Sequence, residues 1–170
     1  ITHLFNAQTG LNHRNPGIVG AALTSDVFTE LIADTFHVHQ GLFSMLYNVK
    51  RDLLVLVTDC TRAGGLPDGE YKLGGQPIYV NGIECRLQDG TIAGSVLRLN
   101  DAARNLHRLG GVTLKDAIHA ASLSAARTIG MDRVKGSIED GKDADFIFID
   151  DECRVYSTFV RGTLKYSKEI

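Results

Sequence analysis

Side chains that could bind a metal or move a proton follow three apolar runs within residues 1–60. His3 and Asn6 end the first run, Asp34 and His37 follow the second, and Asp59 follows the third. In (β/α) barrels the carboxyl ends of the strands carry the active site. The placement therefore indicates an active site at the ends of three strands. Eight strands are needed to close such a barrel, so we expect the others to lie upstream of this chain.

Asp59 and His3 are the candidates for hydrolytic chemistry. A carboxylate beside a Lewis-acidic metal can accept a proton from water, and Asp59 ends the apolar run 53–58 before a loop of small residues. His3 lies in an expected strand, from which an imidazole nitrogen can bind a metal. Alternatively, Asp59 caps the next turn and His3 is a hydrogen-bonded core residue.

A second group of residues could bind an anion. Arg14 lies in the loop 12–17 just before an expected helix, where a guanidinium and free N–H groups both donate to phosphate oxygens. Asn6 and Ala7 could offer backbone amides to the same anion. In the H-x-H pair of His37 and His39, one ring can face the site while the other caps the helix that follows. A surface position for Arg14 is the alternative.

The hydrophobic pattern predicts an α/β chain. We expect strands at 1–5, 28–33 and 53–58, helices at 16–23 and 39–49, β-hairpins within 69–93, helices at 97–109 and 113–129, and strands at 144–150, 154–160 and 163–166. This order predicts the C-terminal portion of a (β/α)8 TIM-type barrel over residues 1–142, followed by strands of a small β-sandwich over 143–170.

Composition narrows the class of protein. The 170 residues are 44% hydrophobic and 22% charged, with a net charge of −2 and scattered cations, which argues against nucleic acid as a partner. The three cysteines have no C-x-x-C spacing, and no apolar run approaches 18 residues. We therefore expect a cytoplasmic protein with no membrane partner. The apolar start at Ile1, without an initiator Met, leads us to expect a fragment.

Several motifs together resemble the N-acetylglucosamine-6-phosphate deacetylases of the amidohydrolase superfamily. The resemblance runs over essentially the whole chain and is to the C-terminal part of such an enzyme only, and the motif His3–Ala7 is the more specific one. The stretch at 136–145 is shared more widely and indicates the superfamily. The matching segments are Thr2–Ala7, Arg14–Gly17, Ala33–Val38, Leu56–Asp59, Gly69–Gly75, Ala93–Ser95 and Gly136–Asp145.

The resemblance implies removal of the acetyl group from N-acetylglucosamine-6-phosphate. It implies that His3 is a metal ligand and that Asp59 is the catalytic residue, which activates a water at the metal and later protonates the leaving amine. Asn6 and Ala7 match a substrate-binding segment, and His37 and Arg14 match phosphate contacts. It also implies a homodimer in which Arg14 reaches the neighbouring site, and a divalent metal, zinc or iron, whose other ligands are expected upstream.

Two departures from the family pattern bear on activity. Gln8 stands where the family usually has Met, which alters packing near the ligand without changing an obvious donor. The family's metal-binding Glu and its other ligand His have no counterpart here, so we expect the chain alone to be inactive. Two alternatives stay open: an amidohydrolase for a different amide or cyclic ureide, and a non-catalytic sugar-phosphate-binding remnant.

Overall fold

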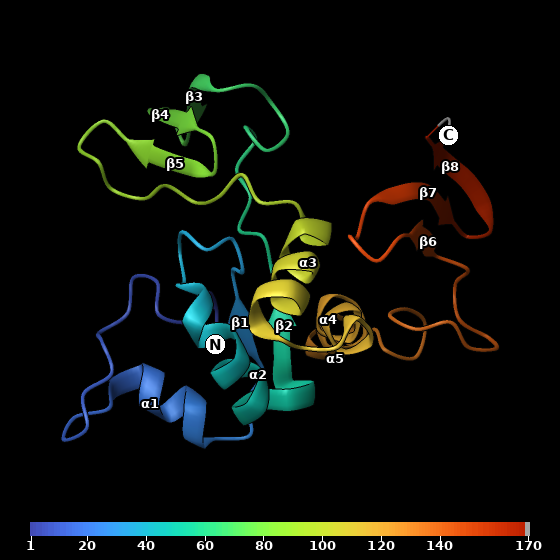
Figure 1. Cartoon of the computed structure of the whole chain (residues 1–170), viewed down its shortest axis with the longest axis horizontal. Helices are drawn as coiled ribbons and strands as arrows, with labels where there is room; N and C mark the ends of the chain where they lie inside the picture. The colour runs from blue at the N-terminus through green and yellow to red at the C-terminus, as the bar shows by residue number, and fades with distance from the viewer. Residues whose placement is uncertain (169–170) are drawn as a thin grey trace.

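The computed structural model describes residues 1–168, which fold into five α-helices and three small sheets (Figure 1). The helices are α1 (Gly17–Thr24), α2 (Phe43–Lys50), α3 (Leu99–Gly110), α4 (Leu114–Ala121) and α5 (Leu123–Thr128), with 3-10 turns at η1 (Gln40–Leu42) and η2 (Arg51–Leu53). The strands are β1 (Thr29–Leu31), β2 (Leu54–Leu56), β3 (Gly69–Leu73), β4 (Gln76–Asn81), β5 (Glu84–Leu87), β6 (Phe146–Ile149), β7 (Val155–Val160) and β8 (Thr163–Ser167). The chain is a mixed α/β protein, as predicted.

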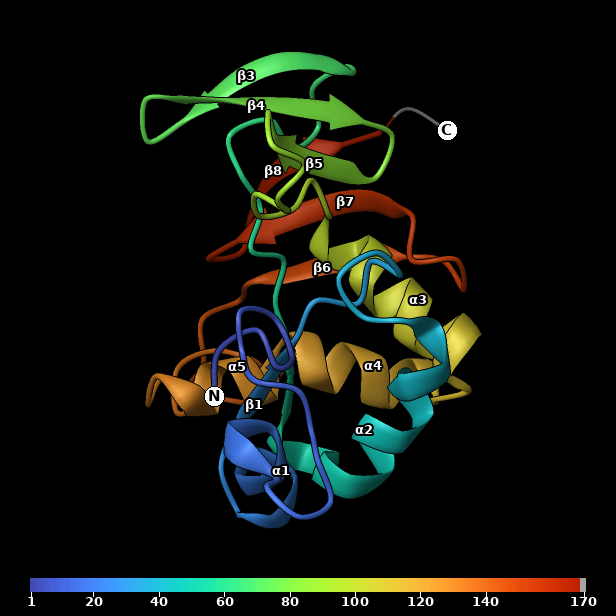
Figure 2. The same cartoon turned by 90° about the vertical axis from the view of Figure 1, so that its left-hand side faces the viewer.

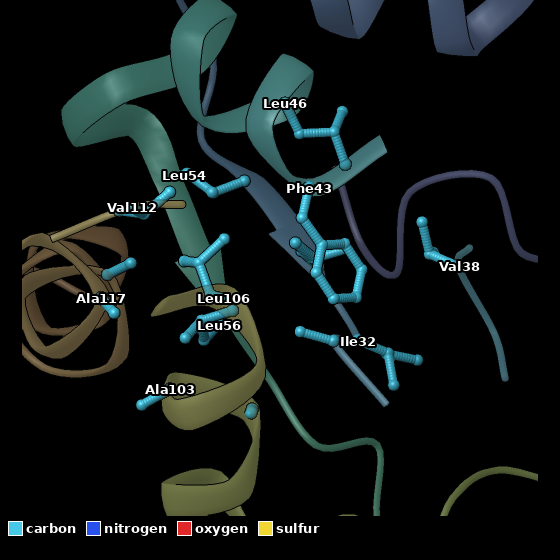
Figure 3. Packing of buried hydrophobic residues seen from close by; sticks show 14 of the residues in the cluster. Ile32, Val38, Phe43, Leu46, Leu54, Leu56, Ala103, Leu106, Val112 and Ala117 are labelled. Atoms are coloured by element: carbon cyan, nitrogen blue, oxygen red, sulfur yellow. The ribbon is translucent and has the colours of Figure 1, made fainter. Parts of the chain in front are cut away.

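The main core surrounds the parallel pair β1–β2. The register places Thr29 opposite Leu54, and all three residues of β2 are buried. A short strand of consecutive apolar residues suits a position covered on both faces, because neither face can then meet water. Figure 3 shows Phe43 of α2 and Leu106 of α3 gathered with the leucines of β2. This packing fixes where the chain emerges after each strand, and therefore where the candidate site residues lie.

The predicted hairpin region is confirmed as the antiparallel sheet β3–β4–β5, seen above α3 in Figure 1. Its first turn uses Gly74 and Gly75, both at positive φ, a conformation that glycine adopts without steric cost. It has its own small cluster of buried residues, formed by Ala63, Ile78, Val80, Cys85 and Ala93. The sheet is therefore a local unit attached to the loop that follows β2.

The C-terminal strands form the antiparallel sheet β6–β7–β8, which stands to the right of α3 in Figure 1 and therefore behind the helices and β3–β5 in the turned view of Figure 2. The rings of Phe146 and Phe159 stack with their centroids 4.7 Å apart. All three strands were predicted from the sequence.

Three predicted elements differ from the structure. Residues 1–5 form a turn, because His3 and Phe5 have positive φ, although two main-chain hydrogen bonds still tie this segment to Glu30 of β1. The helix expected over 113–129 breaks at Ser122, whose ψ of −77° ends α4 before α5 begins. The stretch 39–49 begins as the 3-10 turn η1 and only then becomes α2.

Candidate functional site

His3 lies in the turn beside β1, and one of its ring nitrogens has no partner. Its φ of 29° is uncommon for a residue other than glycine. Its N–H donates to the carboxylate of Glu30 at 3.2 Å, which also accepts from the hydroxyl of Thr2 at 2.5 Å. Within residues 1–168, Nδ1 of His3 is the one buried side-chain nitrogen or oxygen without a hydrogen-bond partner. Buried polar atoms are nearly always satisfied, so this nitrogen is available to a metal or to a donor outside the described residues.

Asn6 and Ala7 continue the same turn. The N–H of Asn6 donates to the carbonyl of His3 at 3.0 Å, and its side-chain amide donates to the carbonyl of Leu4 at 3.2 Å. Ala7 is exposed and has a φ of 53°. The side-chain amide of Asn6 thus supports the turn, and the Ala7 backbone faces solvent in a left-handed conformation.

Gln8 fastens this turn from both ends. Its side-chain oxygen accepts from the N–H of Phe5 at 3.0 Å, and its side-chain nitrogen donates to the carbonyl of Thr2 at 3.1 Å. The residue that departs from the family pattern therefore does act as a donor, toward the backbone of the chain. A methionine could make neither bond, because its thioether has no N–H and is a weak acceptor.

Asp34 and His37 form a buried pair just beyond β1. One oxygen of Asp34 accepts the backbone N–H groups of Phe36 and His37 at 2.9 and 2.7 Å. The other oxygen lies 2.6 Å from Nδ1 of His37, and the two side chains are 3% and 4% exposed. The sequence offered the alternative that one of His37 and His39 faces the site while the other caps the helix that follows. The capping role falls to His39, whose ring accepts the N–H of Gly41 at 3.1 Å at the start of η1.

Asp59 follows β2 in an exposed loop that is held by Ser95. The carbonyl of Asp59 accepts the N–H of Ser95, and the carbonyl of Ser95 accepts the N–H of Thr61, both at 2.9 Å. The hydroxyl of the buried Ser95 donates to the carbonyl of Thr58. Asp59 itself has a φ of 48°. The backbone on either side of this carboxylate is thus fixed, while the residue stays exposed.

Arg14 lies in the exposed loop before α1, as the sequence predicted. Its guanidinium contacts Nε2 of His13 at 2.9 Å, and its backbone N–H donates to the side chain of Asn12 at 3.0 Å. No ion pair to Arg14 is found within residues 1–168. Its positive charge is therefore available to an anion or to another chain.

The loops that carry the candidate residues share unusual backbone conformations. Five of the eight non-glycine residues with positive φ in the described part of the chain lie in them: His3, Phe5, Ala7, Thr35 and Asp59. Residues in such conformations cost stability and cluster at active sites and ligand-binding loops. The strain thus marks the same places that the sequence singled out.

The structure supplies one suitable metal ligand. Nδ1 of His3 has no partner, so it could bind a metal or accept a hydrogen bond. Across residues 1–168, however, no three His, Cys, Asp or Glu side chains gather into a group that could hold an ion. A catalytic zinc typically has three protein ligands, so the described residues fit part of a metal site.

Three residues that support the site were not assigned to it from the sequence. Asp34 was noted at a strand end, but only the structure shows it bonded to His37. Glu30 and Ser95 hold the backbones of His3 and Asp59, and the place of Ser95 in the matching segment Ala93–Ser95 was the signal for its role. Hydrogen bonds that join residues 27 or more positions apart, as these two do, leave no periodic trace in a sequence.

A cavity of about 220 Å³ lies between α3, the hairpin sheet and the loop after β2. Its wall includes Asp34 from the buried pair, together with Arg98, Asp101 and Arg104 at the start of α3. Arg104 pairs with Asp101 at 2.7 Å. The cavity therefore adjoins the Asp34–His37 pair.

Among the helices of residues 1–168, none combines the length and the hydrophobicity that spanning a membrane requires.

A profile of the Amidohydrolase family matches residues 55–165, well over half of the chain. The chain belongs to the amidohydrolase family. This amidohydrolase is 41% identical over 172 residues to a Bacillus subtilis protein named N-acetylglucosamine-6-phosphate deacetylase, which confirms the resemblance seen in the motifs. That match covers 99% of this chain and 43% of the relative. The chain therefore spans less than half the length of that relative.

Two further matches bear on length and fold. An Escherichia coli K12 protein named putative N-acetylgalactosamine-6-phosphate deacetylase is 42% identical over 163 residues, covering 95% of this chain and 98% of that protein. The crystal structure of N-acetylglucosamine-6-phosphate deacetylase from Pasteurella multocida superposes with a TM-score of 0.92 at 33% identity. That structure is matched over 96% of this chain and 43% of its own length. The amidohydrolase thus shares the fold of part of a longer deacetylase.

Proposed function

We propose that this amidohydrolase is the C-terminal part of an enzyme that hydrolyses N-acetylglucosamine-6-phosphate to glucosamine-6-phosphate and acetate. The observation that carries the proposal is 41% identity, over 99% of the chain, to a relative with that named activity. The strained loops at His3, Thr35 and Asp59 support it, because they lie where the family motifs place the chemistry.

In this proposal His3 is one ligand of a divalent metal, zinc or iron. When bound, the metal supplies Lewis acidity that polarises the acetyl carbonyl and makes water a stronger nucleophile. Further ligands come from upstream residues. Because residues 1–168 bring no three donors together, we propose that the chain alone does not turn over substrate.

Asp59 is the acid and base of the proposed reaction. Its exposed carboxylate takes a proton from the attacking water and passes it to the amine nitrogen as the C–N bond breaks. The hydrogen bonds between Ser95 and the backbone on either side keep the carboxylate in place while the proton moves. A carboxylate can do both steps, because it gains a proton in the first and returns it in the second.

The phosphate is bound at the other end of the substrate in this proposal. The guanidinium of Arg14, which has no ion pair among the described residues, and the ring of His37, which Asp34 holds in place, contact the phosphate. The strained turn at Asn6-Ala7 offers backbone amides to the same anion. Arg14 reaches the site of a second subunit, so the enzyme is a homodimer.

We further propose that residues 1–142 belong to a TIM-type barrel with the sheet β3–β5 as an excursion at 69–93, and residues 143–170 to a β-sandwich.

A cytoplasmic location also belongs to the proposal. Cys60, Cys85 and Cys153 are all unpaired, and free thiols are usual in a reducing compartment.

N-acetylgalactosamine-6-phosphate is the second candidate substrate, because the Escherichia coli relative of similar length is named for it. Both sugar phosphates offer the same amide and the same anion, and they differ in the orientation of one hydroxyl.

A chimera tests the proposal. The segment of the Bacillus subtilis protein that matches this chain is replaced by residues 1–170, and acetate release is measured with both sugar phosphates. We expect hydrolysis of N-acetylglucosamine-6-phosphate, lowered by about 10²–10⁴-fold in Asp59→Asn. Asp140→Asn, at an exposed carboxylate in the loop between α5 and β6, is the matched control and should retain full activity.

Three outcomes contradict parts of the proposal. If Asp59→Asn and Asp140→Asn have equal rates, Asp59 is not the proton carrier. If Arg14→Met leaves the KM for the sugar phosphate unchanged, no phosphate contact exists at Arg14, and a different amide or a cyclic ureide becomes the better substrate. Acetate release by the chain alone with added zinc would refute its proposed inactivity.

A further inference from the structure

His37 is held on one side only. Its Nδ1 lies 2.6 Å from an oxygen of Asp34, and its side chain is 4% exposed. The other ring nitrogen, Nε2, has no hydrogen bond to any residue in the described range. Among the described residues, the one side-chain nitrogen or oxygen that is both buried and without a partner is Nδ1 of His3, so Nε2 of His37 is not fully buried. It follows that Nε2 keeps some access to solvent, at the surface of an otherwise buried ring.

Asp34 also fixes which proton the ring carries. Its first oxygen is occupied by the N–H groups of Phe36 and His37, so its second oxygen remains for the ring. A carboxylate only accepts, so Nδ1 must donate. In the neutral ring, Nε2 then has a lone pair and no proton. It can donate to an anion only after the ring gains a second proton and a positive charge.

Neighbouring aromatic contacts restrict the ring further. The rings of Phe36 and His37 meet edge to face with centroids 5.5 Å apart. The guanidinium of Arg86, from β5, lies 4.8 Å above the Phe36 ring. The hairpin sheet therefore braces the loop that presents His37, and rotation of the imidazole would break contacts on two sides.

We infer that Asp34 is a positioning residue that holds the proton of the neutral His37 ring on Nδ1 and aims Nε2 at the phosphate of the substrate, to which the doubly protonated ring can donate. The inference rests on the proposed function for the identity of the anion. The negative carboxylate offsets the positive ring inside the protein, so a protonated pair can be buried without an unpaired charge. A hydrogen bond from a charged ring to phosphate is about twice as strong as one from a neutral ring.

The test is a measurement of the protonated ring nitrogen by long-range ¹H–¹⁵N NMR on the full chain. At a pH where His37 is neutral, the wild type should show Nδ1–H with Nε2 unprotonated. In Asp34→Asn the side-chain oxygen can still accept both backbone N–H groups, but its NH₂ now faces the ring. The neutral ring should then switch to Nε2–H, and the Kd for N-acetylglucosamine-6-phosphate should rise about tenfold.

Asp101→Asn is the matched control, since Asp101 lines the same cavity and bonds Arg104 instead of His37. It should leave both the ring proton and the Kd unchanged. An Nε2–H ring in the wild type overturns the inference without any variant, so a misfolded Asp34→Asn does not protect it. If the wild type shows Nδ1–H but its ring signals ignore added sugar phosphate, the proposed substrate is wrong while the Asp34–His37 pair stands.

Discussion

Replacing Ser95 with Ala should loosen the backbone around Asp59. The Ser95 hydroxyl donates to the carbonyl of Thr58 and accepts the N–H of Leu97 at 3.1 Å, and the residue is fully buried. Alanine removes both bonds and adds no strain, because the two backbone bonds of residue 95 to Asp59 and Thr61 remain possible. The variant therefore isolates what the hydroxyl contributes.

The expected loss is set by the Leu97 N–H, which is left buried without an acceptor. An unsatisfied buried group costs about 1–3 kcal/mol of unfolding free energy. That loss corresponds to a change of roughly 5- to 150-fold in the unfolding equilibrium constant. Local opening should increase as well, because fewer hydrogen bonds now protect the loop, so the amides of Thr61 and Ser95 should exchange faster with solvent.

Urea unfolding and amide hydrogen exchange measure these two effects. Ser44→Ala is the control, because Ser44 is exposed on α2 and accepts only a long 3.4 Å bond from Asn48. Its unfolding free energy should stay within about 0.5 kcal/mol of the wild type. If the two variants have equal stability, or if exchange at Thr61 is unchanged, the hydroxyl does not hold the Asp59 loop and our reasoning is refuted.

Three further predictions concern the scaffold. Phe43→Ala, at a fully buried core position, should lower the unfolding free energy by about 3–5 kcal/mol in urea titration, and a loss below 1 kcal/mol would contradict the core described above. Gly94→Ala should cost more stability than Gly74→Ala, since both have positive φ but only the former places a Cβ 3.0 Å from a backbone oxygen; equal losses would show that the contact relaxes freely. Desolvation raises the pKa of Asp150, but N–H donors from Arg154 outweigh it and lower the pKa from 3.8 to about 2. The ionised carboxylate therefore stabilises the folded state above pH 3.8, and this stabilisation is lost as the pH falls toward 2. Acid unfolding curves of Asp150→Asn should lack this pH-dependent loss of stability.

Much of the fold follows from local patterns. The apolar run at 53–58 predicted the strand that the structure has as β2, the pattern over 69–93 predicted hairpins, and the pattern from residue 113 predicted the helix that begins as α4. These signals are reliable because each depends on residues within a few positions of one another. The turn at residues 1–5 was missed, since the same apolar residues suit a strand unless tertiary contacts bend them.

The sequence by itself determined the family, the order of the elements and the loops in which chemistry-bearing residues occur. It could do so because residue types and their spacing are local properties of the chain. Only the tertiary structure decided that Nδ1 of His3 is buried without a partner, that Asp34 holds His37, and that Ser95 fastens the backbone of Asp59. Burial and long-range hydrogen bonds arise when distant segments pack together, and a carboxylate or hydroxyl looks the same in the sequence whether it meets water or a buried ring.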